Sequence, residues 1–220
     1  MTHNTEYRTQ LACALNGYRA LIVPDLHNND STHWQTIWQQ TIPRASRIRI
    51  HDWHTADWVK WRNSIIASLI CIDEPVVLIA EGFGALAAAS VAAEYPAKVI
   101  ALLLVDPADA DQFDVRKKLP KKALPVPTKI VIRDSFNTDA GAKSALMALL
   151  WNADFHQSAD DTDAGDVDYW PTGVQALDNL VSCSPRDHKD LIQAKTKKIL
   201  AYLRAIKKYY PAGEMHYQHG

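Results

Sequence analysis

The stretch LIAEGFGAL, residues 78–86, has the form of a buried strand that turns sharply into a helix. In one class of enzymes such a turn carries the catalytic nucleophile, and small residues flank it because the strand and the helix pass close together. Ala80 and Gly84 meet that steric requirement on either side of Gly82. No Ser, Cys, Thr or Asp stands in the turn, so it lacks a side chain that could attack a substrate.

Four histidines lie between residues 27 and 54, a density that raises the question of a metal site. They are His27, His33, His51 and His54. Metal ligands converge in space and often show a short fixed spacing, such as two histidines four residues apart on one helix face. These four are spread over a predicted loop, a helix start and a strand end. We therefore expect no metal site and no cofactor, and we expect His33 to cap or pack at a helix start.

The run ADDTDAGDVD, residues 159–168, holds five Asp and resembles a calcium-binding loop at first sight. Read from Asp161 as the first ligand, it places Gly165 fifth rather than sixth and Thr172 where a bidentate Glu belongs. The run is therefore predicted to be a solvated acidic loop.

The composition is that of one globular domain. The chain has 220 residues, of which 47% are hydrophobic and 22% charged, enough to bury a full core. A net charge of -1 argues against nucleic acid as the main partner. The sequence shows no signal-peptide pattern and no apolar run approaching about 18 residues, so we expect a cytoplasmic protein without membrane contact. Three scattered cysteines, Cys13, Cys71 and Cys183, argue against a disulfide framework or a zinc site.

Short apolar runs alternate with helical patterns along the chain. The predicted strands cover residues 19–23, 47–50, 75–80, 98–105 and 128–132. The longest runs are apolar throughout, as in central strands that helices cover on both faces. This alternation predicts an α/β protein with a mostly parallel sheet.

Three helices are predicted between these strands. Thr32 and Gln35 form a possible capping box at the first, and Asp57 is a candidate N-cap for the second. Alanine dominates residues 84–95, which predicts a helix packed closely on the sheet. Most of the seven tryptophans fall on these amphipathic patterns, so core packing is preferred to a sugar-binding platform.

Two further segments depart from the alternating pattern. Residues 106–127 carry four prolines and are predicted to be a long excursion over the carboxyl ends of the strands, where α/β sheets bind ligands. Residues 184–220 contain a basic amphipathic pattern, which predicts a C-terminal helix and tail appended to a domain of residues 1–183. That helix could dock with a solvated basic face, bind an anionic partner or form a dimer contact.

An ordered series of motifs links these segments to a known family. The motifs are IVP (22–24), HWQxxW (33–38), DW (52–53), PVVLIAxGxG (75–84), LLVDPAD (103–109), LPVP (124–127) and WPTG (170–173). In this order they resemble the small single-domain serine hydrolases related to retinoblastoma-binding protein 9. The resemblance implies an α/β-hydrolase fold with five or six strands in a mostly parallel sheet, helices on both faces and an extra C-terminal helix.

Carried over by position, the resemblance implies that the catalytic triad is missing. The family's nucleophile falls on Gly82 and the histidine before it on Glu81. The family's acid falls on Phe136 or Asn137, and its base falls on Asp160. A serine alcohol attacks only when an imidazole takes its proton and an acid orients that imidazole. The resemblance therefore implies a non-catalytic binding or regulatory pseudoenzyme.

The same resemblance implies a ligand pocket beside the turn. An oxyanion hole would use the backbone N–H of Phe83 and another from the loop near Leu26 and His27. Asp25, where the family usually has Gly, and Glu81 would bring acidic side chains close to it. We expect this pocket to disfavour anions.

Two other functions stay open at this stage. An esterase-type hydrolase could use displaced residues: Ser90, Ser135 or Ser158 as nucleophile, His27 or His156 as base, and Asp134 or Asp139 as acid. Alternatively, the chain could be a structural or interaction protein that acts through the basic C-terminal helix. The partner is expected to be an unknown small molecule or protein, and a homodimer is possible.

Overall fold

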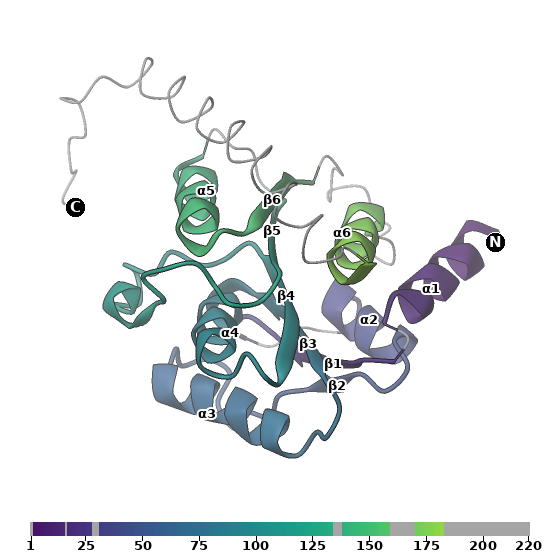
Figure 1. Cartoon of the computed structure of the whole chain (residues 1–220), viewed down its shortest axis with the longest axis horizontal. Coiled ribbons are helices and arrows are strands. Elements are labelled where there is room, and N and C mark those ends of the chain that lie inside the picture. Colours follow the sequence, from purple (N-terminus) through teal and green to yellow (C-terminus); the bar gives the residue numbers. More distant parts are fainter. Residues whose placement is uncertain (1, 16, 28–30, 134–137, 159–169, 183–220) are drawn as a thin grey trace.

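A single parallel sheet organises the part of the chain that the computed structural model describes, which is residues 2–15, 17–27, 31–133, 138–158 and 170–182. Its six strands lie in the order β2-β1-β3-β4-β5-β6 (Figure 1). Their bounds are β1 Arg19–Val23, β2 Ser46–Arg47, β3 Val76–Glu81, β4 Val99–Val105, β5 Thr128–Ile132 and β6 Asp154–Gln157. All neighbouring strands are parallel, which confirms the predicted α/β fold class.

The strand predictions hold for the four inner strands of the sheet, β1, β3, β4 and β5. The apolar runs at 19–23 and 128–132 are strands with those bounds. The edge strand β2 is shorter than the predicted 47–50, because it pairs with β1 only at Ser46 and Arg47. The other edge strand, β6, has the mixed sequence DFHQ and was not among the five apolar runs, since an edge strand needs no continuous apolar character.

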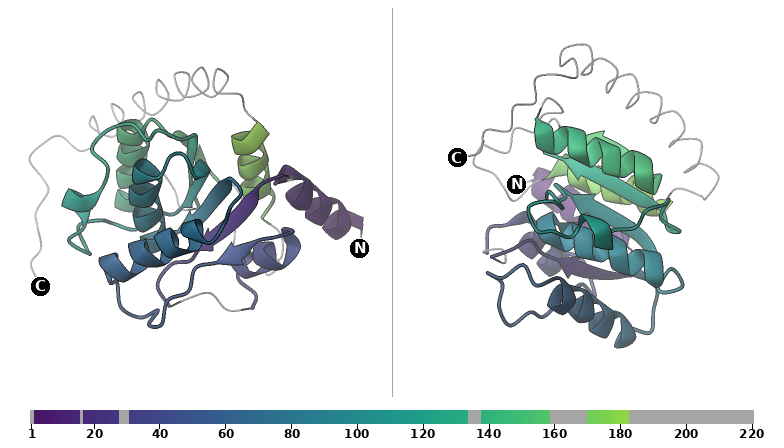
Figure 2. Two further views of the ribbon diagram at one scale, coloured as in Figure 1. Left: turned by 60° about the horizontal axis from the view of Figure 1, so that its bottom comes forward. Right: turned by 90° about the vertical axis from the view of Figure 1, so that its left-hand side faces the viewer.

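Helices cover both faces of the sheet, as predicted (Figure 2). One face packs against α3 (Trp58–Ile70), α4 (Gly82–Glu94) and α5 (Asp139–Trp151). The opposite face packs against α1 (Thr2–Ala14), α2 (Trp34–Thr41) and α6 (Pro171–Ser182). Each face has its own buried hydrophobic cluster, so the central strands lie between two cores. Helices α1 and α5 were not predicted from the sequence.

One of the two predicted helix caps is confirmed and the other is wrong. The Asp57 carboxylate accepts hydrogen bonds from the backbone N–H groups of Val59 and Lys60, as an N-cap does. At α2 the N-cap is His33 rather than Thr32, because its Nδ1 accepts from the Gln35 N–H at 3.2 Å. An imidazole nitrogen here takes the place of the hydroxyl that a capping box would use.

Tryptophan side chains fill the core, as the helical spacing predicts. Trp34, Trp38 and Trp170 contact one another, with ring centroids 4.8 to 5.7 Å apart. Of the seven tryptophans, Trp53 alone is half-buried, and the other six are buried. Such aromatic contacts stabilise beyond the area they bury.

Several predictions concern residues outside the described part of the chain. They include the acidic run 159–168, Cys183 and the basic segment 184–220, so the division into residues 1–183 and 184–220 stays a prediction. Cys13 and Cys71 are exposed free thiols. Among the helices described, none has the length and apolar character needed to cross a membrane.

A buried ion pair joins the amino ends of β5 and β6. Lys129 and Asp154 are register partners, and the Lys129 Nζ lies 3.0 Å from the Asp154 Oδ2. Their side chains are only 5% and 0% exposed, so neither charge is compensated by bulk water. The two charges must compensate each other, which fixes the pairing of the edge strand.

We expect Lys129→Met to lower the free energy of unfolding by about 3–5 kcal/mol, because it leaves the Asp154 carboxylate buried without its cation. Urea denaturation followed by circular dichroism measures the change. Lys60→Met is the matched control, since Lys60 pairs with Asp57 at the surface and such pairs contribute about 0–1 kcal/mol. Equal losses in the two variants would contradict the prediction.

Candidate functional site

The turn between β3 and α4 is a strand-to-helix elbow with Gly82 at its apex. Gly82 has a φ of +55°, in the left-handed region that side chains disfavour. Two residues on, a Cβ at Gly84 would lie 2.1 Å from the Pro24 carbonyl oxygen. Glycine at position 84 therefore lets the start of α4 pass against the end of β1, as the sequence predicts for a nucleophile elbow.

The side chain of Asp25 occupies the space that a nucleophile would fill at this apex. A Cβ placed on Gly82 would lie 1.9 Å from the Asp25 Cγ and 2.1 and 2.2 Å from its two carboxylate oxygens. The backbone N–H of Phe83 donates to the Asp25 Oδ1 at 2.7 Å. Asp25 thus takes both the position of the missing side chain and the main donor of the expected oxyanion hole.

The Asp25 carboxyl group lies in an environment that disfavours its charge. Burial raises its pKa, and this outweighs the lowering by hydrogen bonds from the backbone N–H groups of Phe83 and Leu26. The negative charge of Glu81 raises the pKa of Asp25 further. A second anion brought to this position would meet the same burial and the same repulsion.

Glu81, at the position of the family's histidine, is buried in a network of its own. Its Oε2 lies 3.2 Å from the His33 Nε2, and its Oε1 accepts from the Arg133 guanidinium. Burial alone would raise the pKa of Glu81, but the hydrogen bond from His33 and the charge of Arg133 outweigh it, and the net pKa is lowered. Glu81 is therefore held as a carboxylate.

Both ring nitrogens of His33 have polar partners. Its Nδ1 accepts from the Gln35 N–H, so the hydrogen of the neutral ring is on Nε2, which faces Glu81. Neither nitrogen is left to accept a proton from a nucleophile or to bind a metal. The predicted role of His33 at the helix start is confirmed.

Arg133 and Asp106 join the network at the carboxyl ends of β5 and β4. The Asp106 carboxylate accepts from the Arg133 backbone N–H at 2.8 Å and from its guanidinium. Arg133 thus links Asp106 to Glu81 across three neighbouring strand ends. Neither residue was predicted from the sequence to belong to the site, although each directly follows a predicted strand.

The excursion between β4 and β5 covers the elbow, as predicted. The Ala108 N–H donates to the Gly82 carbonyl at 3.1 Å. The Phe113 ring packs on Phe83, with the centroids 4.9 Å apart. Together these contacts place the excursion over the apex of the turn.

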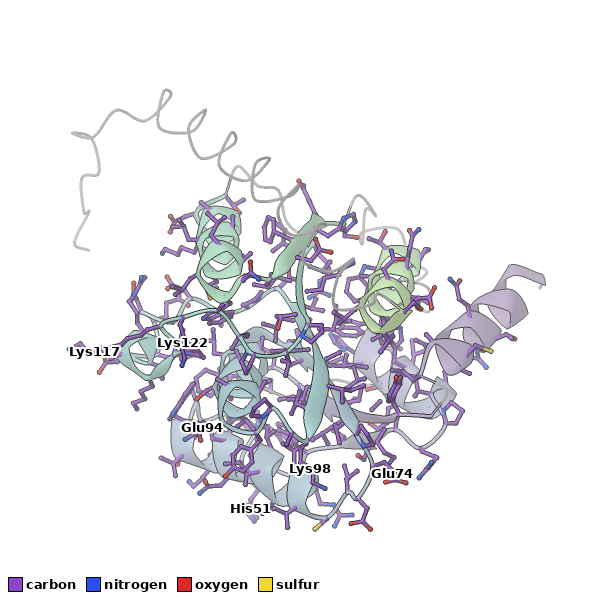
Figure 3. All side chains as sticks on the ribbon, in the orientation of Figure 1. His51, Glu74, Glu94, Lys98, Lys117 and Lys122 are labelled. Atoms are coloured by element: carbon purple, nitrogen blue, oxygen red, sulfur yellow. The ribbon has the colours of Figure 1, made fainter. Side chains whose placement is uncertain are left out.

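The structure brings two of the four clustered histidines together. The Nδ1 atoms of His27 and His54 lie 2.9 Å apart. The backbone N–H of His27 donates to the Trp53 carbonyl at 2.7 Å and is thereby engaged away from the oxyanion hole. His51 lies at the surface (Figure 3). Within the described residues no group of three or more His, Cys, Asp or Glu could hold a metal ion.

The displaced residues considered for an active enzyme are scattered. Ser90 is buried in α4, and Ser158 is buried and accepts from the Trp170 indole N–H at 3.3 Å. His156 is exposed on β6, and Asp139 is an exposed residue that pairs with Lys143. Ser135 and four positions of the expected catalytic loops lie outside the described residues: Asp134, Phe136, Asn137 and Asp160.

Comparison with known proteins finds similarity in both sequence and structure. The sequence profile of the serine hydrolase family matches residues 20–179. A search of curated proteins finds no significant match. Among solved structures, a YdeN-like hydrolase from Pectobacterium atrosepticum is similar, with a TM-score of 0.70 and 27% identity over 80% of this chain and 97% of that one. Alpha/beta hydrolase domain-containing protein 10 from mouse has a TM-score of 0.47 and 14% identity, over 84% and 90% of the two chains.

The contact between Asp25 and Gly82 predicts strong coupling between the two positions. Gly82→Ser is expected to destabilise the protein by about 2–4 kcal/mol through the clash and the positive φ. Adding Asp25→Gly removes the clash and should recover about 1–3 kcal/mol. Urea denaturation of the two single variants and the double variant measures the coupling.

Gly17→Ser is the matched control for this cycle. Gly17 also has a positive φ, of 90°, but a Cβ there would meet nothing within 4 Å. It therefore isolates the backbone strain from the clash. If Gly82→Ser were no more destabilising than Gly17→Ser and showed no coupling to Asp25→Gly, the placement of Asp25 would be wrong.

The raised pKa of Asp25 predicts a pH dependence of stability. A raised folded pKa means that the folded protein holds the proton longer, so the contribution of Asp25 to stability falls as pH rises from its unfolded pKa, about 3.9, through the folded one. Asn keeps the oxygen that accepts from Phe83 without the charge. Asp25→Asn should therefore be more stable than the native chain at pH 7, and the difference should shrink toward pH 4.

Asp57→Asn is a comparison variant for which the pH dependence of stability has the opposite sign. Hydrogen bonds from the Lys60 backbone N–H and side chain lower the pKa of Asp57, so its contribution is present at neutral pH and is lost as pH falls through the folded pKa. Urea denaturation between pH 3.5 and 7.5 should show this variant less stable than the native chain at pH 7. If the native chain were more stable than Asp25→Asn at pH 7, the raised pKa assigned to Asp25 would be wrong.

Proposed function

The chain belongs to the serine hydrolase family, and we propose that it acts within that family as a non-catalytic binding or regulatory protein. One observation carries the proposal: the Asp25 carboxylate fills the place of the nucleophile side chain at Gly82. A glycine alone could be bypassed by a neighbouring nucleophile. A glycine whose vacant space holds a carboxylate leaves no room for a substrate carbonyl to approach the turn.

The loss extends from the nucleophile to transition-state stabilisation. Acyl transfer at such an elbow needs a backbone donor for the developing oxyanion, and removing one donor typically costs about 10²–10³ in rate. The Phe83 N–H is the donor that follows the apex, and it already binds Asp25. On this proposal the pair Gly82 and Asp25 accounts for both losses: Gly82 supplies no attacking group, and Asp25 occupies the Phe83 N–H donor.

The neighbouring acidic groups point to the kind of ligand. Asp25 and Glu81 are both acidic where hydrolases of this family bind an anionic intermediate, and Glu81 is held ionised by His33 and Arg133. We propose that the ligand is an uncharged or cationic small molecule, or a protein segment of that character, bound at the carboxyl edge of the sheet. Anionic ligands are disfavoured by repulsion.

A fluorophosphonate probe tests the absence of serine-hydrolase catalysis. The folded native chain should show no labelling above that of the heat-unfolded chain, and no hydrolysis of p-nitrophenyl esters above buffer. Probe labelling that disappears on replacing Ser90, Ser135 or Ser158 with Ala would overturn the proposal in favour of a hydrolase with displaced residues.

Rebuilding the site tests the same proposal from the other direction. The variant combines Gly82→Ser, Asn137→Asp and Asp160→His with Asp25→Gly, because Ser at position 82 cannot coexist with the Asp25 carboxylate. It should acquire probe labelling and ester hydrolysis about 10²-fold or more above the native chain, the range that a positioned base supplies. The matched control keeps Asp25 and should stay inactive. Equal activity with and without Asp25 would contradict the role assigned to that side chain.

A further inference from the structure

We propose that His27 and His54 form a binding site for a divalent transition-metal ion of the zinc class. The two imidazoles come from different loops, after β1 and after β2, and their Nδ1 atoms approach to 2.9 Å. The rings are inclined by 56°, with centroids 5.0 Å apart, so they meet at their nitrogens rather than stack. This site is independent of the proposed function, since neither histidine holds Asp25 or Glu81.

Hydrogen bonds hold both loops in place. The His27 N–H donates to the Trp53 carbonyl at 2.7 Å, which ties the first loop to the second. In the second loop, the Asp52 carboxylate accepts from the His54 N–H at 2.9 Å and from the Thr55 hydroxyl at 2.5 Å. The two imidazoles are thus brought together before any ligand binds, which lowers the entropy cost of binding.

The backbone of His27 is unusual. Its φ is 70°, in the left-handed region that non-glycine residues seldom occupy. Such conformations cost about 1–3 kcal/mol and persist where the surrounding structure demands them, often at binding sites. Here the left-handed backbone of His27 accompanies a contact between its exposed ring and the ring of His54. An exposed histidine has no need of such a contact to be solvated.

The spacing of the nitrogens suits a shared ion. At metal–nitrogen distances of about 2.0–2.1 Å, two nitrogens on one ion lie about 2.9 Å apart at a right angle and about 3.3 Å apart at the tetrahedral angle. The two Nδ1 atoms are 2.9 Å apart, so they would have to move apart by at most about 0.4 Å to bind one ion. In the neutral pair one Nδ1–H donates to the other Nδ1, so binding moves that hydrogen to Nε2 of the same ring through solvent.

The other nearby histidines do not compete for this role. Both nitrogens of His33 are engaged, by Gln35 and Glu81. His51 is exposed at the surface. With two protein ligands, the ion would keep water in its other positions, unlike the closed four-ligand sites of structural zinc.

Zinc titration of the full chain tests the site. After removal of metal with EDTA, Zn²⁺ is titrated at pH 7.5 by isothermal calorimetry into the native chain, His27→Gln, His54→Gln and the control His51→Gln. The native chain and the control should share a one-to-one site, and each of the other two variants should bind about 10-fold more weakly or worse, since even loss of an outer-shell partner costs 10–100-fold. Zinc sites elsewhere in the chain would appear equally in all four proteins.

Nitrogen-15 NMR of the histidine rings gives a second reading that needs no variant. Zinc should shift the Nδ1 signals of His27 and His54 and move the hydrogen of the donor ring to Nε2. Unchanged ring signals at these two residues, or unchanged affinity in both variants, would overturn the proposal. An equal loss in His51→Gln would also overturn it, because it would show diffuse surface binding.

Discussion

The absence of a Cβ at Gly82 is the constraint on which the site depends. It lets the Asp25 carboxylate come within 1.9 Å of the position where a side-chain carbon would stand, and it lets that carboxylate reach the Phe83 N–H. The two residues are far apart in the chain but form one unit in the fold. A side chain at position 82 and an acid at position 25 exclude each other sterically, so the chemistry of the elbow is decided by the pair rather than by either residue.

Several charged side chains lie at the carboxyl edge of the sheet, near the elbow. Burying an ion is costly unless an opposite charge and hydrogen bonds compensate it. The Arg133 guanidinium meets this requirement for both Glu81 and Asp106, and His33 adds its Nε2 hydrogen to Glu81. Three strand ends and the start of α2 are thereby linked. The Glu81 carboxylate, at the end of β3, is the group that His33 and Arg133 share.

The loop after β1 combines both features of interest. Asp25 lies against the elbow, and two residues later His27 adopts a left-handed backbone and meets His54. The same few residues therefore fill the space beside the apex of the elbow and bring a pair of imidazoles together at the surface.

Local patterns in the sequence determined the architecture: apolar runs predicted the central strands, Asp57 predicted a cap, and the small residues around Gly82 predicted the elbow. These features depend on neighbours a few residues away, so spacing is enough to read them. Spacing also indicated that the nucleophile was missing. Only the tertiary structure decided that Asp25 fills its place, that His33 rather than Thr32 caps α2, that Arg133 joins Glu81 to Asp106, and that His27 meets His54. Each of these depends on a contact between strand ends or loops distant in sequence, where the direction of a side chain is set by the packing of the whole sheet.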